Sequence, residues 1–313
     1  MTTYAALLSR SRIADQGFYL LVDPQADCDE DHVLHPDNLL ARFATDAVEP
    51  VLRADLTHDL SACPRLITLA NAGQTLDEDF LRMTVNVALA EHIGGKRLIC
   101  GWLSSPSPLT VVAEHLAQRC LVAEQNAQRV VPFFEPLRLE LLAVSLRDSI
   151  GPWLWPISQW IVPSSGGRLL HLSGNGNAHA PSLGVAEISA QYLAPMVGSV
   201  LSAWQQLTTQ PMRADLHALA PLLRETPGPA IHAAAKVLAH LRRSHALGLG
   251  KAQDRMTFAL QHLTVNPHLE AHPRIQQCIQ EAAAGKTSLE DALGALERAE
   301  WHDLLATLTR TRS

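Results

Sequence analysis

The sequence predicts an α/β N-terminal lobe, a mixed sheet flanked by helices, followed by an all-α C-terminal lobe. Up to about residue 172, short branched and aromatic runs alternate with helical patterns, which is typical of a sheet covered by helices. From about residue 185 only helical spacing of apolar residues recurs. We therefore expect a domain over residues 1–175 and a helical lobe over 185–313, joined by a loop or linker at 173–184.

Four segments of the first lobe have the composition of strands. Their residues are almost continuously apolar, as expected for strands that are covered on both faces. The first of them stops at Asp23-Pro24, which is a turn signal. The segments are FYLLV (18–22), RLITLA (65–70), KRLICGWLSS (96–105) and RVVPFF (129–134).

Helices are expected between these strands because their ends carry local signals. Thr75 and Glu78 fit a capping box, and Gly94-Gly95 follow the apolar pattern as a stop. Ser107-Pro108 predicts a second helix start, with serine as the N-cap and proline in the first turn.

The stretch VVPFFEPLRLELL (130–142) predicts a sharp corner between a strand and a helix. Phe133 and Phe134 are expected in the core. Glu135 stands at or just before the N-cap, where the helix dipole favours a negative charge. Pro136 fits the first helical position, because no hydrogen bond is lost there, and it biases Glu135 away from helical geometry.

Two segments of the second lobe carry clear helix signals. GPAIHAAAKVLAHLRRSHALGLG (228–250) has helical apolar spacing, with Pro229 at its start and basic residues and Gly248 at its end. TSLEDALGALERAEWHDLLATL (287–308) opens with a second capping box, from Thr287 to Glu290.

Charge, hydropathy and cysteine content exclude several classes of protein. The net charge of −6 lacks the basic footprint of a nucleic-acid binder. No run of about 18 apolar residues predicts a membrane span, and the N-terminus has no signal-peptide pattern. Five widely spaced cysteines without a CxxC motif indicate reduced thiols, so we expect a cytoplasmic protein. They are Cys28, Cys63, Cys100, Cys120 and Cys278.

The loop after the first predicted strand contains possible metal ligands. Asp27, Asp29 and Asp31 have the D-x-D-x-D spacing of a calcium loop. Such a loop needs glycine at its sixth position and glutamate at its twelfth, where this chain has His32 and Asn38. A solvated acidic loop is therefore the favoured interpretation.

Three further patterns resemble ligand sites without completing one. Cys28, His32 and His35 lie close together in the loop, but a zinc site would need a fourth ligand from elsewhere. Gly285-Lys286-Thr287 matches the end of a phosphate-binding loop, but a helical segment precedes it and Gly285 fits a helix stop better, with Thr287 as the next N-cap. His268 and His272 are four apart, but Pro273 follows and no HExxH glutamate is present.

No catalytic motif stands out elsewhere. The chain has no GxSxG motif and no glycine-rich dinucleotide loop. We therefore expect no enzyme, no cofactor and no metal centre.

Three tryptophans within eight residues are the strongest anomaly in the composition. Trp153, Trp155 and Trp160 lie in IGPWLWPISQWIVPSSGGRLLHL (150–172). Core packing is the favoured interpretation. The alternative is a partner-binding surface, because tryptophan is enriched among the residues that dominate binding energy at protein interfaces.

Several segments, taken in order, resemble one family. They are FYLLVDP, CPRLITLA, ICGWLSSPSPLTVVAEHLAQR, VVPFFEPLRLELL and IGPWLWPISQWIVPSSGGRLLHL, covering residues 15–172, about half of the chain. The family is that of the type VI secretion effector adaptors or chaperones, also called Tap or TEC. Its members typically carry Arg-Phe-aromatic-Asp-Pro-Arg before a leucine-rich helix. Residues 132–137 keep the aromatic pair and the proline and have Glu135 for the acid; both arginines are absent, and Arg138 stands one place beyond the second.

The resemblance implies a cytoplasmic adaptor rather than an enzyme. Such an adaptor binds a cognate toxin effector and helps load it onto the spike protein of the secretion system. Two alternatives are an immunity protein, which binds a toxin and inhibits it, and a metal-dependent hydrolase. The tryptophan group would then contribute to the surface that contacts the partner.

Overall fold

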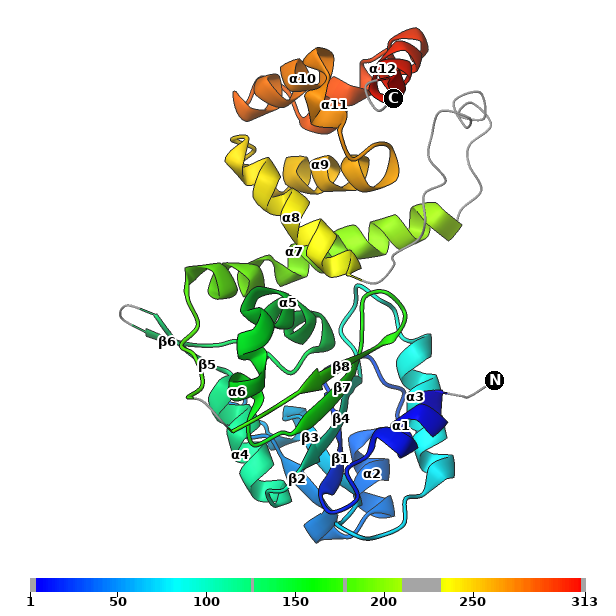
Figure 1. Cartoon of the computed structure of the whole chain (residues 1–313), viewed down its shortest axis with the longest axis vertical. Helices are drawn as coiled ribbons and strands as arrows, with labels where there is room; N and C mark the ends of the chain where they lie inside the picture. Colours follow the sequence, from blue (N-terminus) through cyan, green and yellow to red (C-terminus); the bar gives the residue numbers. More distant parts are fainter. Residues whose placement is uncertain (1–3, 125–126, 177–178, 210–231, 311–313) are drawn as a thin grey trace. The chain divides into compact units, whose positions relative to one another are not determined.

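The computed structural model describes residues 4–124, 127–176, 179–209 and 232–310 (Figure 1). The chain divides into two compact units, Met1–Ala194 and Pro195–Ser313. The boundary lies inside a long helix, α7 (Val185–Thr209), and not in the loop predicted at 173–184. The fold class is as predicted: a sheet flanked by helices comes first, and a helical region, α7 to α12, follows.

The first unit is built around a six-stranded sheet in the order β2-β3-β1-β4-β7-β8. All five pairings are antiparallel. The helix between β3 and β4 carries the chain over β1, so these two strands run parallel with β1 between them. The strands are β1 (Gly17–Val22), β2 (Val48–Pro50), β3 (Arg65–Ala70), β4 (Ile99–Ser105), β7 (Gln159–Pro163) and β8 (Leu169–Ser173).

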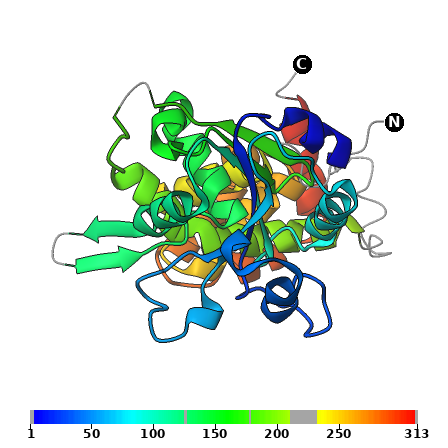
Figure 2. The same cartoon turned by 90° about the horizontal axis from the view of Figure 1, so that it is seen from below.

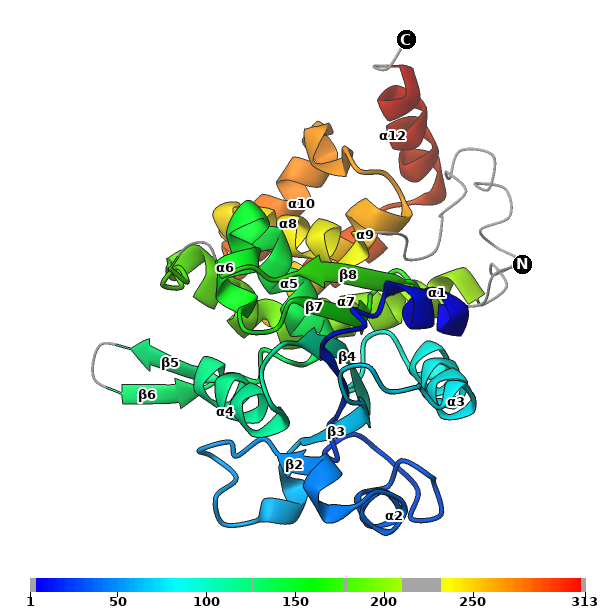
Figure 3. The ribbon, with the colours of Figure 1, turned by 60° about the horizontal axis from the view of Figure 1, so that its bottom comes forward.

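Each face of the sheet carries its own apolar core, so the strands are buried on both sides. Tyr19 and Leu21 of β1 point into one core, and Phe18, Leu20 and Val22 point into the other. Figure 3 shows the helices that follow β3 and β4 on opposite sides of the strands. The helices of the first face are α4 (Leu109–Arg119), α5 (Pro136–Leu146) and α6 (Ile150–Leu154), and those of the second are α1 (Tyr4–Ser11), α2 (Pro36–Arg42) and α3 (Glu78–Ala90).

One predicted strand belongs elsewhere. RVVPFF (129–134) contributes only its first residues to β6 (Ala127–Val130), which pairs with β5 (Leu121–Glu124) in a separate hairpin. Figure 2 shows this hairpin extending beside the helices. Phe133 and Phe134 follow it as a turn and are 2% and 1% exposed, so their predicted core position is confirmed.

Among the helix starts predicted in the first unit, only that of α5 is confirmed. Pro136 begins α5 with Glu135 as its N-cap residue, as predicted. The capping box at Thr75 is wrong, because Asp77 is the N-cap of α3 and accepts the N–H of Phe80 at 2.9 Å. At α4 the N-cap is Pro108 rather than Ser107, and no side chain caps it.

The described part of the second unit contains helices only. A core of apolar side chains joins the helices from α9 to α12, including Phe258, Ile275, Leu289 and Leu304. The helix predicted from Pro229 begins at Ala233, and Pro229 itself lies outside the described residues. The remaining helices are α8 (Ala233–Ala246), α9 (Ala252–Thr264), α10 (Pro273–Ala283), α11 (Leu289–Gly294) and α12 (Arg298–Arg310). Among the described residues, no helix has the length and apolar character needed to cross a membrane.

Candidate functional site

The three predicted tryptophans have different environments. Trp153 and Trp160 are buried in the core on the α4–α5–α6 face, 3% and 1% exposed. Trp153 packs edge-on against Phe133 at 5.4 Å between ring centroids, and the Trp160 indole N–H donates to the Cys100 carbonyl at 3.3 Å. Core packing therefore accounts for these two. A partner contact remains a prediction only for Trp155, whose side chain is 42% exposed.

The backbone around Trp155 is held in place by close approaches. Gly176 lies against the indole ring, because a Cβ on it would come within 2.9 Å of the ring. Gly174 passes the Ile157 carbonyl so closely that a Cβ would clash, and Asn175 N–H donates to the Gly151 carbonyl at 3.1 Å. The glycines in the predicted linker thus allow the chain after β8 to pass close to Trp155 and Ile157, and the Asn175 hydrogen bond attaches it to α6. Trp155 is consequently an exposed aromatic side chain with one side of its ring against Gly176.

A cluster of six charged side chains lies at one end of the sheet, and we call it the sheet-end cluster. Asp23 follows β1, and its N–H donates to the Leu98 carbonyl just before β4. Since neighbouring strands are antiparallel, the end of β1, the end of β2 and the start of β4 all lie at the same end of the sheet. The N-terminal turn of α5 adds its own charges there. The members are Asp23, Arg53, Asp55, Lys96, Glu135 and Arg138.

Ion pairs connect the cluster to α5. Lys96 Nζ lies 3.8 Å from Asp23 Oδ2 and 3.9 Å from Glu135 Oε1. Arg138 Nε donates to Glu135 Oε2 at 2.7 Å, and Arg138 Nη1 donates to the Gln191 carbonyl at 2.7 Å. Glu135 therefore acts through these partners and does not cap the helix with its side chain. Arg138, outside the family pattern, supplies the positive charge next to the acid.

Two buried groups of the cluster stand out. Arg53 pairs with Asp55 at 2.6 Å and lies over the Phe134 ring at 5.8 Å. Asp23 is completely buried, and burial raises the pKa of its carboxyl, while the Lys96 charge opposes that rise. Three acids and three bases leave the cluster close to neutral. Such a balanced arrangement fits a structural junction between β1, β4 and α5 better than a charged substrate site.

Two more acids lie near the start of β4 and along α5: Glu91, which is half-buried, and Glu140, which is buried. Glu140 accepts the backbone N–H of Ser165 at 2.7 Å and its hydroxyl at 2.8 Å, which fastens the turn after β7 to α5. Glu91 follows α3 and accepts the N–H of Leu98. Burial raises the pKa of Glu91 to about 7, although the nearby Arg97 charge and the backbone hydrogen bonds lower it.

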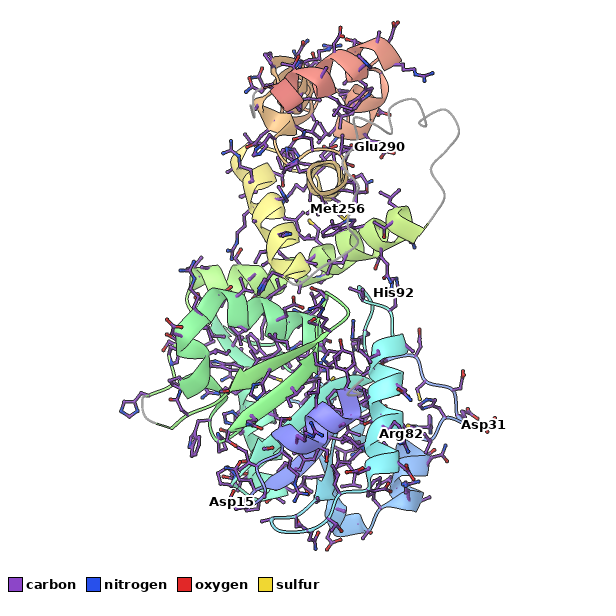
Figure 4. The ribbon with its side chains drawn as sticks, turned by 45° about the vertical axis from the view of Figure 1, so that its right-hand side comes forward. Asp15, Asp31, Arg82, His92, Met256 and Glu290 are labelled. Atoms are coloured by element: carbon purple, nitrogen blue, oxygen red, sulfur yellow. The ribbon has the colours of Figure 1, made fainter. Side chains whose placement is uncertain are left out.

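The acidic loop after β1 is held by its own side chains. Asn38 Nδ2 donates to the carbonyls of Glu30 and His32 at 2.8 and 2.9 Å. His32 Nδ1 accepts the N–H of Leu34 at 3.2 Å. Figure 4 shows Asp31 at the outside of the loop, pointing away from the sheet. Within the described ranges, no three His, Cys, Asp or Glu side chains come together as a possible metal site, the trio Cys28, His32 and His35 included.

The remaining sequence patterns have structural roles. Gly285 follows α10 with a φ of 71°, which is the predicted helix stop. The N-cap of α11 is Ser288 and not Thr287, since its hydroxyl accepts the N–H of Asp291 at 3.0 Å. His272 is the N-cap residue of α10 and accepts the N–H of Arg274, so it does not share a helix face with His268.

Comparison with known proteins adds no further identification. No family model matches the chain, and no match was found among curated proteins or among solved structures. The resemblance to the effector adaptors therefore remains a prediction from the quoted segments.

The sheet-end cluster is the feature that sequence reasoning missed. Its members are spread from residue 23 to residue 138, and only the pairs Arg53–Asp55 and Glu135–Arg138 are near neighbours in the sequence. One signal was available: Asp23, Lys96 and Glu135 all stand at predicted strand ends. Antiparallel pairing of β1 with β4, which the alternating pattern did not specify, brings Asp23 and Lys96 together, and the start of α5 adds Glu135.

Proposed function

We propose that this chain is a cytoplasmic adaptor that binds a cognate toxin effector and helps load it onto a type VI secretion spike protein. The segments quoted in the sequence analysis support a resemblance to the effector adaptor family. The observation that carries the proposal is Trp155, an exposed indole beside two tryptophans that are buried. A large aromatic side chain on the surface exposes apolar area to water, which is unfavourable. A partner that covers the ring would remove this exposed area.

The surroundings of Trp155 suit a binding role. Its ring already packs against Gly176, so less side-chain entropy is lost when a partner covers the ring. The same region is unusual in charge, because residues 149–186 contain no Asp or Glu although the chain has 31. This stretch therefore contributes no negative charge that would repel an acidic partner surface.

The test is the affinity for the toxin whose gene adjoins that of this chain. Trp155→Ala should weaken binding by about tenfold or more, as expected for an aromatic residue at the centre of an interface. Leu52→Ala is the matched control, because Leu52 is also exposed, at 54%, but lies after β2. Both variants should keep the melting temperature of the wild type. Equal affinities of the two variants and the wild type would remove the role of Trp155.

The same complex separates an adaptor from an immunity protein. An adaptor leaves the toxin active when it is bound and allows the spike protein to join. An immunity protein blocks the active site of the toxin. Toxin activity measured in the purified complex therefore decides between them.

A further inference from the structure

Strand β8 is the last strand of the sheet, and its outer backbone groups point away from β7. Gly174 N–H donates to the Ser158 carbonyl at 2.9 Å, and Ser164 N–H donates to the Arg168 carbonyl at 2.7 Å. In an antiparallel pair, hydrogen-bonded and non-hydrogen-bonded pairs alternate along the strands. The backbone N–H and C=O groups of Leu170 and Leu172 therefore bond to β7. Those of the remaining strand residues, Leu169, His171 and Ser173, point outward from the sheet.

The two edges of the sheet differ in their protection. At the opposite edge, β2 has three residues and ends at Pro50, which shortens the edge that another strand could join. Strand β8 has five residues with no proline or lysine, and His171 at its centre is exposed. Its C-terminal end lies close to α6, where the Ser173 carbonyl approaches Gly151. Among the described residues, no hydrogen bond reaches the outward N–H or C=O groups of Leu169 and His171.

Charge indicates what kind of segment would pair there. Arg168 immediately precedes β8 and is exposed, as is His171. Both belong to the stretch 149–186, which has no acidic residue in a chain of net charge −6. Trp155 lies just past the other end of the strand, against Gly176. The strand itself thus presents Arg168 and His171, with Trp155 as an aromatic anchor past its end.

We propose that the outer edge of β8 binds an extended, acidic segment of the partner protein as an additional strand. Backbone hydrogen bonds to Leu169 and His171 would supply affinity, and Arg168 would select for acidic side chains. This proposal rests on the proposed adaptor function, since it assigns the partner's segment to a place on the first unit.

Amide hydrogen exchange tests the edge directly, with residue-level resolution. In the free protein, the amide of His171 should exchange fast, while those of Leu170 and Leu172 exchange slowly. Binding of the toxin from the adjoining gene should slow the amides of Leu169 and His171. A slow His171 amide in the free chain, or an unchanged one in the complex, would overturn the proposal.

A proline substitution tests the same hydrogen bond by affinity. Proline is tolerated on edge strands where the N–H faces solvent, so His171→Pro should fold. It should weaken toxin binding by about tenfold or more. The substitution removes one backbone hydrogen bond, and the proline ring keeps the partner strand from approaching closely. His171→Ala keeps the N–H and should bind within about threefold of the wild type. Arg168→Glu should weaken binding through like-charge repulsion.

The outcomes separate this proposal from the adaptor function. If His171→Pro binds the toxin like His171→Ala, the edge is not the docking strand, although the adaptor function stands. If the wild type binds no toxin, the adaptor function fails and this proposal fails with it. If light scattering shows a wild-type dimer that His171→Pro converts to a monomer, the edge pairs with a second copy, which also overturns the proposal.

Discussion

Replacing Glu91 by glutamine should remove a pH-dependent loss of stability in the first unit. Burial raises the pKa of Glu91 from 4.5 to about 7. Its carboxylate accepts the N–H of Leu98 at the start of β4, and its second oxygen, Oε2, is buried without a hydrogen-bond partner. The ionised form is therefore poorly compensated in the folded chain. Arg97 nearby lowers the pKa but does not outweigh burial.

The sign and size follow from proton linkage. Between the unfolded and folded pKa values the folded state binds more protons, so its stability falls as pH rises. The contribution of Glu91 is fully present below pH 4.5 and is lost as pH rises through 7. A shift of this size corresponds to about 3 kcal/mol in the free energy of unfolding. Glu91→Gln does not titrate, so its stability relative to the wild type should rise by about 3 kcal/mol from acidic to alkaline pH.

Urea unfolding is monitored through hydrogen exchange of the β4 amides, which measures this difference for the first unit alone. The variant and the wild type are compared at about pH 4 and about pH 8, so all other titrating groups cancel. Glu114→Gln, on the exposed side of α4, controls for the loss of one carboxylate. A difference for Glu91→Gln that stays flat with pH, or falls as pH rises, would refute the reasoning.

Three further predictions concern other buried groups. Gly101→Ala should destabilise the first unit by about 2 kcal/mol or more in urea unfolding, because φ is +132° there and a Cβ would lie 2.6 Å from the Ile161 carbonyl. Glu140→Gln should cost about 2 kcal/mol by the same assay, since one oxygen that accepts from Ser165 becomes a donor. Burial lowers the pKa of His262 from 6.5 to about 4, so the second unit should lose stability as pH falls through this range. His262→Gln should flatten that dependence when exchange of the α9 amides is followed; an unchanged slope would assign it to other groups.

The sequence predicted three of the six strands of the sheet, β1, β3 and β4, and predicted the helix boundaries less well. Strand β3 matches its predicted span, residue for residue, because its apolar run ends at turn residues on both sides. Helix α3 begins at Glu78 and not after Thr75, since Asp77 can cap the same turn and only side-chain geometry decides between the two. Local signals of this kind leave a choice of two or three positions.

The candidate site was less accessible from the sequence. Adjacent tryptophans in one segment have opposite environments: Trp153 is in the core and Trp155 is at the surface. Tertiary packing determines which ring is covered, since Trp153 lies against Phe133 and Arg119 from other elements. The outward groups of His171 likewise depend on which strand lies at the edge, and no composition signal specifies strand order.

The most direct test of the central claim is co-purification with the toxin encoded beside this chain. The adaptor function predicts a stable complex in which the toxin keeps its activity and to which the spike protein can be added. Size-exclusion chromatography with light scattering, followed by an activity assay on the same fraction, measures both properties. Failure to form a complex, or a complex in which the toxin is inactive, would contradict it.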